Sequence, residues 1–163
     1  PEYVRDEVAI FFCGIDRING KLEERINKEN LQNELIYVGA VSNDEMKKFY
    51  SIADGLIMPS LAEGLSIAAL EAIAYGLPVI MSAKSECADD LSDENVSVLA
   101  KTQESSSIAE AITTWFNKKW DRKYIMKCAS NFTMENMAEQ YIELNKKVIE
   151  NERYDCEHHM STV

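Results

Sequence analysis

The feature that most constrains the fold is an alternation of short apolar runs with segments of helical spacing, which continues through residue 100. The runs are too short for helices and are typical of strands that are buried on both faces. They are Val8–Cys13, Leu35–Val38, Gly55–Met58, Val79–Met81 and Val96–Leu99. Because strand and helix alternate, the sequence predicts an α/β fold, a Rossmann-like parallel sheet with right-handed crossovers and helices on both faces.

Apolar residues at helical spacing mark the segments between these strands. We expect helices around Leu22 and Ile26, over Met46–Ala53 and over Ile67–Ala74. After the last strand the pattern turns helical, so the fold is expected to close with C-terminal helices.

Two apolar stripes mark the closing helices, and core packing is the interpretation for both. The first consists of Ile108, Ala111, Ile112, Trp115 and Phe116. The second consists of Met134, Met137, Ala138, Tyr141, Ile142, Val148 and Ile149.

The segment 151–163 is polar and shows no apolar period, so it is expected to be a frayed tail. Its Cys156, His158 and His159 could hold a metal ion, although a single cluster at a terminus is more often without function. The predicted organisation is therefore one domain over residues 1–150 and a polar tail over residues 151–163.

Composition excludes several classes of function. With 28 acidic and 17 basic residues the 163-residue chain has a formal charge of -11, which disfavours nucleic acid and anionic membrane surfaces as partners. The four cysteines are scattered without Cys-x-x-Cys spacing, so we interpret them as reduced thiols. The chain shows no signal-peptide pattern and no apolar run of about 18 residues, which indicates a cytoplasmic protein.

The stretch most informative about function runs from Tyr50 to Ile80. A short strand ends at Met58, a Pro-Ser turn follows, and an apolar helix comes next. Doubly wound sheets bind ligands where the carboxyl end of a strand leads into a helix. Free N–H groups and the positive end of the helix dipole make that place suited to a phosphate.

Polar and small residues around this helix start fit a bound anion. Gly64 would let a diphosphate approach the backbone, and Ser66 could cap the helix or donate a hydrogen bond. Glu63 and Glu71 could accept hydrogen bonds from sugar hydroxyls on either side of the anion. Taken alone, the spacing of the two glutamates is a weak signal, and it is more often explained by Glu63 favouring the positive helix start and Glu71 being a solvated helix residue.

Four spaced elements stand out in this stretch: YSIAD from Tyr50, PSLAEGLS from Pro59, LEA from Leu70 and AYGLPVI from Ala74. Together they resemble the signature of the retaining glycosyltransferases of family 4, also called group 1, which have the GT-B fold of two facing Rossmann-like domains. In weaker form the resemblance covers roughly residues 5 to 150. It implies the C-terminal, donor-binding domain of such an enzyme.

The resemblance assigns roles to matching positions. It implies that Glu63, the catalytic candidate, faces the donor sugar and that Glu71 holds the ribose hydroxyls. The turn Gly64-Leu65-Ser66, with Ile67 beside it, would contact the diphosphate or sugar through its backbone. The strand end from Gly39 to Val41 would border the base. The resemblance implies that no metal and no cofactor are needed. The donor, a UDP- or GDP-sugar, is the substrate.

The sequence departs from the family pattern in two regions. Ser66 and Ala68 replace a common glycine and proline, and residues 83–90 replace a Gly-Gly-x-x-Glu turn, so the sugar is not readable. The opening strand, its Arg and Lys clamp for the diphosphate, and the N-terminal acceptor domain have no counterpart in this sequence. In the strand order 3-2-1-4-5-6 the first strand is central. Its neighbours are then expected either to pair directly or to receive that strand from residues outside this sequence.

The resulting expectation is the donor-binding lobe of a retaining glycosyltransferase, which transfers a hexose from a UDP- or GDP-sugar to a glycan or lipid-linked acceptor. Because its N-terminal part is missing, the chain is expected to be inactive alone. The alternatives are a noncatalytic nucleotide-binding or docking module derived from such a domain and a nucleotide-sugar epimerase. A dehydrogenase is disfavoured because no Gly-x-Gly-x-x-Gly follows a strand. A nucleophilic triad is disfavoured because the only histidines, His158 and His159, lie in the tail.

Overall fold

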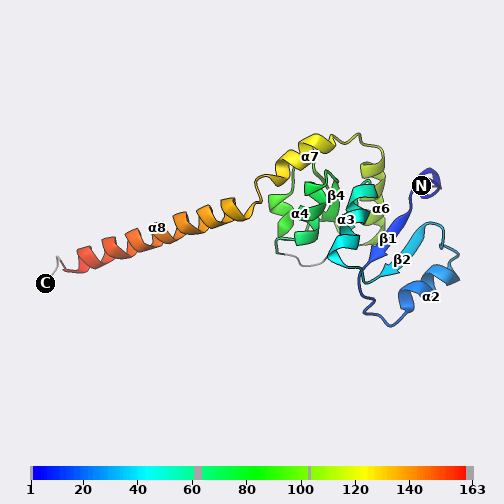
Figure 1. Cartoon of the computed structure of the whole chain (residues 1–163), viewed down its shortest axis with the longest axis horizontal. Coiled ribbons are helices and arrows are strands. Elements are labelled where there is room, and N and C mark those ends of the chain that lie inside the picture. The colour runs from blue at the N-terminus through cyan, green and yellow to red at the C-terminus, as the bar shows by residue number, and fades with distance from the viewer. Residues whose placement is uncertain (1, 61–63, 103, 161–163) are drawn as a thin grey trace.

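The computed structural model describes residues 2–60, 64–102 and 104–160, and for Glu2, Cys87 and residues 151–160 it describes the backbone alone. Helices and strands alternate up to β5, and helices follow it (Figure 1). The strands are β1 (Ile10–Cys13), β2 (Leu35–Gly39), β3 (Leu56–Met58), β4 (Val79–Ser82) and β5 (Ser97–Ala100). The helices are α1 (Glu2–Arg5), α2 (Lys21–Lys28), α3 (Asn43–Ile52), α4 (Ile67–Ala74), α5 (Cys87–Asp90), α6 (Ser105–Phe116), α7 (Arg122–Ala129) and α8 (Met134–Met160).

The strands form two parallel sheets, one of β1 and β2 and one in the order β3-β4-β5. In the first, Ile10 pairs with Leu35, and in the second, Val79 pairs with both Leu56 and Ser97. Among the described residues β1 does not pair with β3, so the expectation that these neighbours pair directly is wrong. In the part of the chain that the structure describes, each of these two strands has a hydrogen-bonded neighbour on one side only. The other alternative, a central strand from residues outside this sequence, stays a prediction.

The buried core is built around β4, where every residue is buried. Its side chains alternate between the two faces of the sheet, as the pleat requires. Val79 and Met81 pack in a cluster that includes Ile73 of α4 and Ile125 of α7. Ile80 packs on the other face, against Ala111 of α6. The predicted α/β fold with helices on both faces of a parallel sheet is therefore confirmed.

The turn from α4 into β4 depends on a glycine. Gly76 has a φ of +75°, a left-handed backbone conformation that residues other than glycine adopt only at a cost in free energy. A Cβ built there would lie 2.8 Å from the carbonyl oxygen of Arg122. This close approach lets α7 pack beside α4, and Pro78 follows as the acceptor of a hydrogen bond from the N–H of Leu56.

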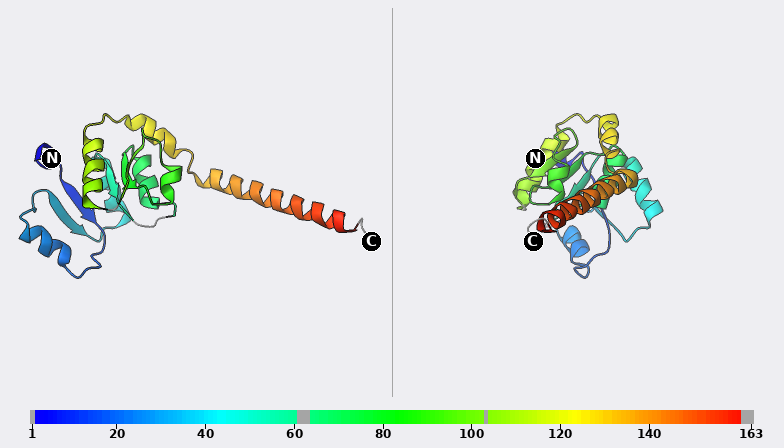
Figure 2. Two further views of the ribbon diagram at one scale, coloured as in Figure 1. Left: turned by 180° about the vertical axis from the view of Figure 1, so that it is seen from behind. Right: turned by 90° about the vertical axis from the view of Figure 1, so that its left-hand side faces the viewer.

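Helix α8 differs from the sequence prediction in two respects. The expected frayed tail is helical as far as Met160, and its Glu, Arg and His residues are compatible with a helix. The apolar stripe that begins at Met134 was expected to pack in the core, and its side chains are exposed instead. Figures 1 and 2 show why: α8 projects away from the rest of the molecule, so the predicted helix is confirmed and its predicted burial is wrong. Within the described residues, no helix combines the length and apolarity needed to cross a membrane.

Candidate functional site

The start of α4 lies at the carboxyl end of β3, and a serine joins the two elements. The Ser66 hydroxyl oxygen accepts a hydrogen bond from the N–H of Ala69 at 3.4 Å, which makes Ser66 the N-cap of α4. The same hydroxyl donates to the sulfur of Met58, the last residue of β3, at 2.9 Å. Ser66 is buried, so its side chain fixes the helix start, and its hydroxyl proton is already engaged.

The residues around this N-cap face solvent. Leu65 and Ile67 are exposed at 51% and 72%, and a Cβ built on Gly64 would meet no atom within 4 Å. Among the described residues, no acceptor pairs with the backbone N–H groups of Ile67 and Ala68. Free N–H groups at a helix start, next to open space, are able to bind an anion.

Glu71 lies on the next part of α4 and is oriented by a tyrosine from α3. The hydroxyl of Tyr50 lies 3.2 Å from Glu71 Oε2 and 3.4 Å from the carbonyl oxygen of Ala68, so its single proton serves two acceptors. The Tyr50 side chain is 6% exposed, and its ring lies 5.6 Å from that of Tyr75. Glu71 itself is exposed, which leaves its other carboxylate oxygen open to hydroxyl donors from solvent or from a ligand.

Burial, which is the largest cause, together with the charge of Glu71 and the hydrogen bond to it, raises the pKa of Tyr50 to about 12. Tyr50 therefore stays a neutral hydrogen-bond donor at physiological pH. A neutral, buried donor holds a carboxylate in place without cancelling its charge. The predicted binding residue Glu71 thus has a fixed partner that its own sequence neighbourhood does not reveal.

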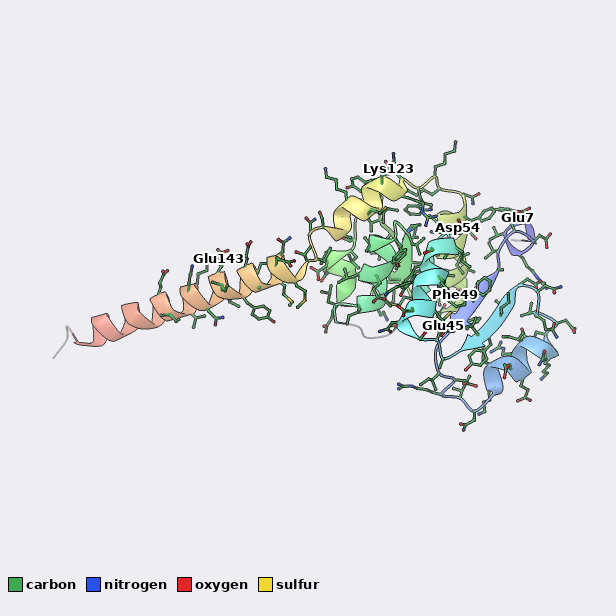
Figure 3. The ribbon with its side chains drawn as sticks, in the orientation of Figure 1. Glu7, Glu45, Phe49, Asp54, Lys123 and Glu143 are labelled. Atoms are coloured by element: carbon green, nitrogen blue, oxygen red, sulfur yellow. The ribbon has the colours of Figure 1, made fainter. Side chains whose placement is uncertain are left out.

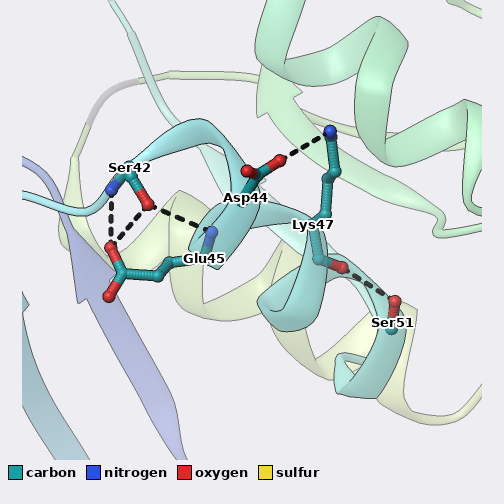
Figure 4. A network of polar contacts seen from close by, with 5 residues as sticks. All are labelled: Ser42, Asp44, Glu45, Lys47 and Ser51. Atoms are coloured by element: carbon teal, nitrogen blue, oxygen red, sulfur yellow. Dashed lines mark hydrogen bonds and ion pairs between the residues drawn. The ribbon is translucent and has the colours of Figure 1, made fainter.

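Helix α3, which carries Tyr50, is itself fixed at its first turn. The Ser42 hydroxyl accepts from the N–H of Glu45, while the Glu45 carboxylate accepts from the N–H and the hydroxyl of Ser42 (Figure 4). These hydrogen bonds, with that from the backbone first, lower the pKa of Glu45. A Lys47–Asp44 ion pair and a bond from Ser51 to the Lys47 carbonyl follow along the helix. Such capping sets where α3 begins and hence the position of Tyr50 two turns later.

The two residues predicted to border the base lie at and just beyond the end of β2. Gly39 has a φ of +83°, and its carbonyl accepts from the N–H of Gly14 at 2.8 Å. Val41 lines a hollow of about 300 Å³ between β2 and α3. The hollow is further lined by Val38, Glu45, Lys48, Phe49 and Ile52, and Figure 3 labels Glu45 and Phe49 on α3. The lining of the hollow is thus mostly apolar and includes one acidic and one basic residue, Glu45 and Lys48.

The structure brings together Ser66, Ile67 and Glu71 on one short helix, with Gly64 and Leu65 directly before it. Glu63, the catalytic candidate, lies outside the described residues. Tyr50 was not predicted as a site residue. Its place in the apolar stripe of α3 indicates a buried ring, and a buried tyrosine hydroxyl usually has a hydrogen-bond acceptor nearby. Among the described side chains no group of three or more His, Cys, Asp and Glu gathers, and metal independence stays a prediction.

Residues 2–132 match the family described as "Glycosyl transferases group 1", which is most of the chain. The chain belongs to this family. Its α/β architecture is that of the Rossmann-like C-terminal domains of GT-B glycosyltransferases, as the solved structures below show.

Three similar proteins illustrate the match and its extent. An uncharacterized glycosyltransferase of Methanocaldococcus jannaschii, MJ1607, is 24% identical over 151 residues, which are 90% of this chain and 39% of that protein. A solved GtfA/B complex superposes with a TM-score of 0.71 at 20% identity, over 88% of this chain and 30% of that chain. HepE of Anabaena, solved with UDP and glucose, superposes with a TM-score of 0.57 at 20% identity, over 92% of this chain and 44% of that chain. This group 1 glycosyltransferase chain therefore spans less than half the length of each.

Proposed function

We propose that this chain is the donor-binding lobe of a retaining glycosyltransferase of family 4, which transfers a hexose from a UDP- or GDP-sugar to a glycan or lipid-linked acceptor. The observation that carries the proposal is the pairing of an open helix start with an oriented carboxylate on α4. Family membership supplies the reaction class, and the solved HepE complex with UDP and glucose supports a nucleotide diphosphate and a hexose as donor parts.

In this proposal the start and the middle of α4 have different tasks. The N–H groups of Ile67 and Ala68, with the positive end of the helix dipole, would bind the diphosphate. Glu71, one and a half turns along from Ser66, would accept hydrogen bonds from the ribose hydroxyls, with Tyr50 holding its Oε2. The hollow beside Val41 would receive the base, whose flat ring suits an apolar recess.

Chemistry at the sugar would rest on stabilisation of the leaving nucleoside diphosphate, on which charge develops as its bond to the anomeric carbon of the sugar breaks and the acceptor oxygen bonds to that carbon. The helix start is the part of this chain that meets that charge. Glu63 would face the donor sugar, a role that its place in the family signature suggests. No metal is needed in this proposal, and basic groups from outside this sequence would complete the neutralisation of the diphosphate.

The acceptor site would lie in a second, N-terminal domain, since catalysis in this fold takes place between two lobes. For that reason we expect no detectable transfer by this chain alone. The chain would bind the nucleotide and depend on residues outside this sequence for turnover.

Calorimetric titration with UDP and with GDP tests the donor site. We expect one of the two to bind, and Glu71→Ala to weaken that binding about tenfold or more, because hydrogen bonds to a charged group contribute about 1.5 to 3 kcal/mol. The fold should survive the change, since the Tyr50 hydroxyl keeps the Ala68 carbonyl as a second acceptor.

Glu110→Ala, which removes an exposed carboxylate from α6, is the matched control and should bind like the parent chain. Equal affinity of the Glu71→Ala variant would remove Glu71 from the site. If neither nucleotide binds to the parent chain, the noncatalytic docking module becomes the better description.

A further inference from the structure

The hollow beside Val41 is lined by one row of side chains from α3. The row consists of Glu45, Lys48, Phe49 and Ile52. Because these positions are three or four residues apart, or adjacent, they lie on one side of the helix. The opposite side of α3 carries Tyr50, which is buried in the core and bonded to Glu71. One helix therefore joins the hollow to the carboxylate that the proposed function assigns to the ribose.

The lining of the hollow offers both an apolar surface and polar groups. Ile52 is 71% exposed, and Phe49 is half-buried beside it. Val38 and Val41 complete the apolar part. An apolar surface with a small number of placed polar groups is the usual composition of a small-molecule site. The polar groups of this hollow should therefore determine which base it accepts.

Glu45 offers one carboxylate oxygen to the hollow in a fixed position. The N–H and the hydroxyl of Ser42 both donate to Oε2 of Glu45, at 2.8 and 2.7 Å (Figure 4). Among the described residues no donor bonds to Oε1. The hydrogen bonds from Ser42 lower the pKa of Glu45, so the carboxylate is ionised at neutral pH and only accepts hydrogen bonds.

Lys48 offers a cationic donor close to this oxygen. The adjacent Lys47 pairs with Asp44 Oδ1 at 2.8 Å, whereas Lys48 forms no ion pair with a described side chain. Lys48 follows Glu45 by three residues, so the two are neighbours on the helix surface. The charge of Lys48 also lowers the pKa of Glu45. The hollow thus presents a fixed acceptor and an unpaired donor side by side.

The edges of guanine and uracil differ in how they match this pair. Guanine places the acceptor O6 next to two donors, its N1–H and its 2-amino group. Uracil places its single donor, N3–H, between the acceptors O4 and O2. A carboxylate that faces the uracil edge therefore meets carbonyl oxygens, which repel it, whereas on guanine it meets donors alone. The pair of an acceptor and a cationic donor fits guanine.

We infer that the donor substrate of this chain is a GDP-sugar, whose guanine is selected by Glu45 and Lys48. Oε1 of Glu45 accepts hydrogen bonds from N1–H and the 2-amino group, and Lys48 Nζ donates to O6. The base lies against Phe49 and Val41. This inference rests on the proposed function, since the hollow receives a base only if α4 binds the nucleotide.

Calorimetric titration with GDP, UDP and inosine diphosphate tests the selection. Inosine diphosphate keeps O6 and N1–H but lacks the 2-amino group. The parent chain should bind GDP at least about tenfold more tightly than UDP or inosine diphosphate, because each of these loses a hydrogen bond to a charged group.

Glu45→Gln separates the role of Glu45 toward the base from its role as a cap. Glutamine serves in a capping box as glutamate does, so α3 should keep its start. Its amide oxygen then accepts from Ser42, and its NH2 group faces the hollow, where it repels the donors of guanine. In this variant the preference for GDP over inosine diphosphate should fall to about one.

Two matched controls come from the same helix. Asp44→Asn removes a carboxylate of α3 that does not line the hollow and should keep the preference for GDP. Lys48→Met should weaken the binding of GDP and of inosine diphosphate by about threefold or more, since both carry O6. Lys47→Met should change neither affinity.

The outcomes distinguish this inference from the proposed function. If neither GDP nor UDP binds to the parent chain, the proposed function fails and the inference with it. If UDP binds as tightly as GDP or more tightly, the donor site stands and the selection of guanine is overturned. An unchanged preference for GDP over inosine diphosphate in Glu45→Gln would overturn it as well, because Glu45 would then act only as a cap of α3.

Discussion

The two sheets of this domain have the same strand direction but differ in how fully they are enclosed. In the sheet β3-β4-β5 the central strand has hydrogen-bonded neighbours on both sides and helices on both faces, and all its residues are buried. In the sheet β1-β2 each strand has one neighbour, and no residue of either strand is fully buried. Phe11 of β1 is 47% exposed even though its ring lies 5.8 Å from that of Phe49.

This difference shows which part of the molecule carries its stability. Buried apolar area is the main favourable term in folding, and it is concentrated around β4, α4 and α7. Figure 2 shows β1, β2 and α2 set to one side of that body. The proposed donor site spans both regions, because α4 belongs to the enclosed sheet and the hollow beside Val41 to the open one.

The largest expected effect is the loss of a fully buried side chain from the enclosed region. Ile73→Ala should lower the free energy of unfolding by about 2 to 5 kcal/mol, since it leaves a cavity that the packed core cannot fill. Phe11→Ala, the matched truncation in the open sheet, should cost much less because its side chain is about half exposed. Urea unfolding followed by fluorescence measures both. If Phe11→Ala lowered the free energy of unfolding as much as Ile73→Ala, the enclosed sheet would not be the main source of stability.

A smaller difference is expected between the strands in local opening. Amide hydrogen exchange should be at least about tenfold slower in β4 than in β1 and β2, because opening β4 breaks two ladders and exposes two faces. Exchange measured by mass spectrometry on peptides from Leu35–Gly39 and Val79–Ser82 gives the ratio. Equal protection would indicate that both sheets open together as one cooperative unit.

The fold could be predicted from the sequence because its signals are local. Strands with uninterrupted apolar runs, such as Val79–Met81, and helices with a clear stripe, such as that of Ile108–Phe116, are where they were expected. Helix α7 was not predicted, since its mixture of lysine, tyrosine and cysteine has a weak apolar period, and it forms because Ile125 is buried against α4.

What the sequence could not show depends on contacts between distant segments. The exposure of the apolar stripe of α8 follows from where the helix points, and spacing alone does not encode that. The site is a similar case. Ser66 caps the helix start, as the sequence predicts. Its hydrogen bond to Met58 and the hydrogen bond from Tyr50 to Glu71 were not predicted, because they join residues that are 8 and 21 positions apart in the sequence. The role of Glu63 rests on its place in the family signature, and it stays a prediction.

The smallest effect is expected at the rim of the enclosed region, where a single hydrogen bond joins α7 to the segment before β5. The Tyr124 hydroxyl donates to Asp93 Oδ2 at 2.6 Å, and this bond, followed by that from the N–H of Asn95, lowers the pKa of Asp93 below 3.8. A carboxyl whose pKa is lower in the folded state contributes stability above its unfolded pKa and loses it as the pH falls through the folded value.

The hydrogen bond to Asp93 also raises the pKa of Tyr124 to about 12. The stability that the Tyr124 hydroxyl contributes is therefore present below its ordinary pKa of about 10 and is lost as the pH rises toward 12. Tyr124→Phe should therefore flatten the dependence of the urea midpoint on pH at both ends while shifting it less at neutral pH than Phe11→Ala does, because Tyr124 is exposed, Asp93 is only partly buried, and solvent screens their interaction. A larger shift at neutral pH would mean that this rim bond, rather than the buried contacts of β4, determines how firmly α7 is held to the sheet.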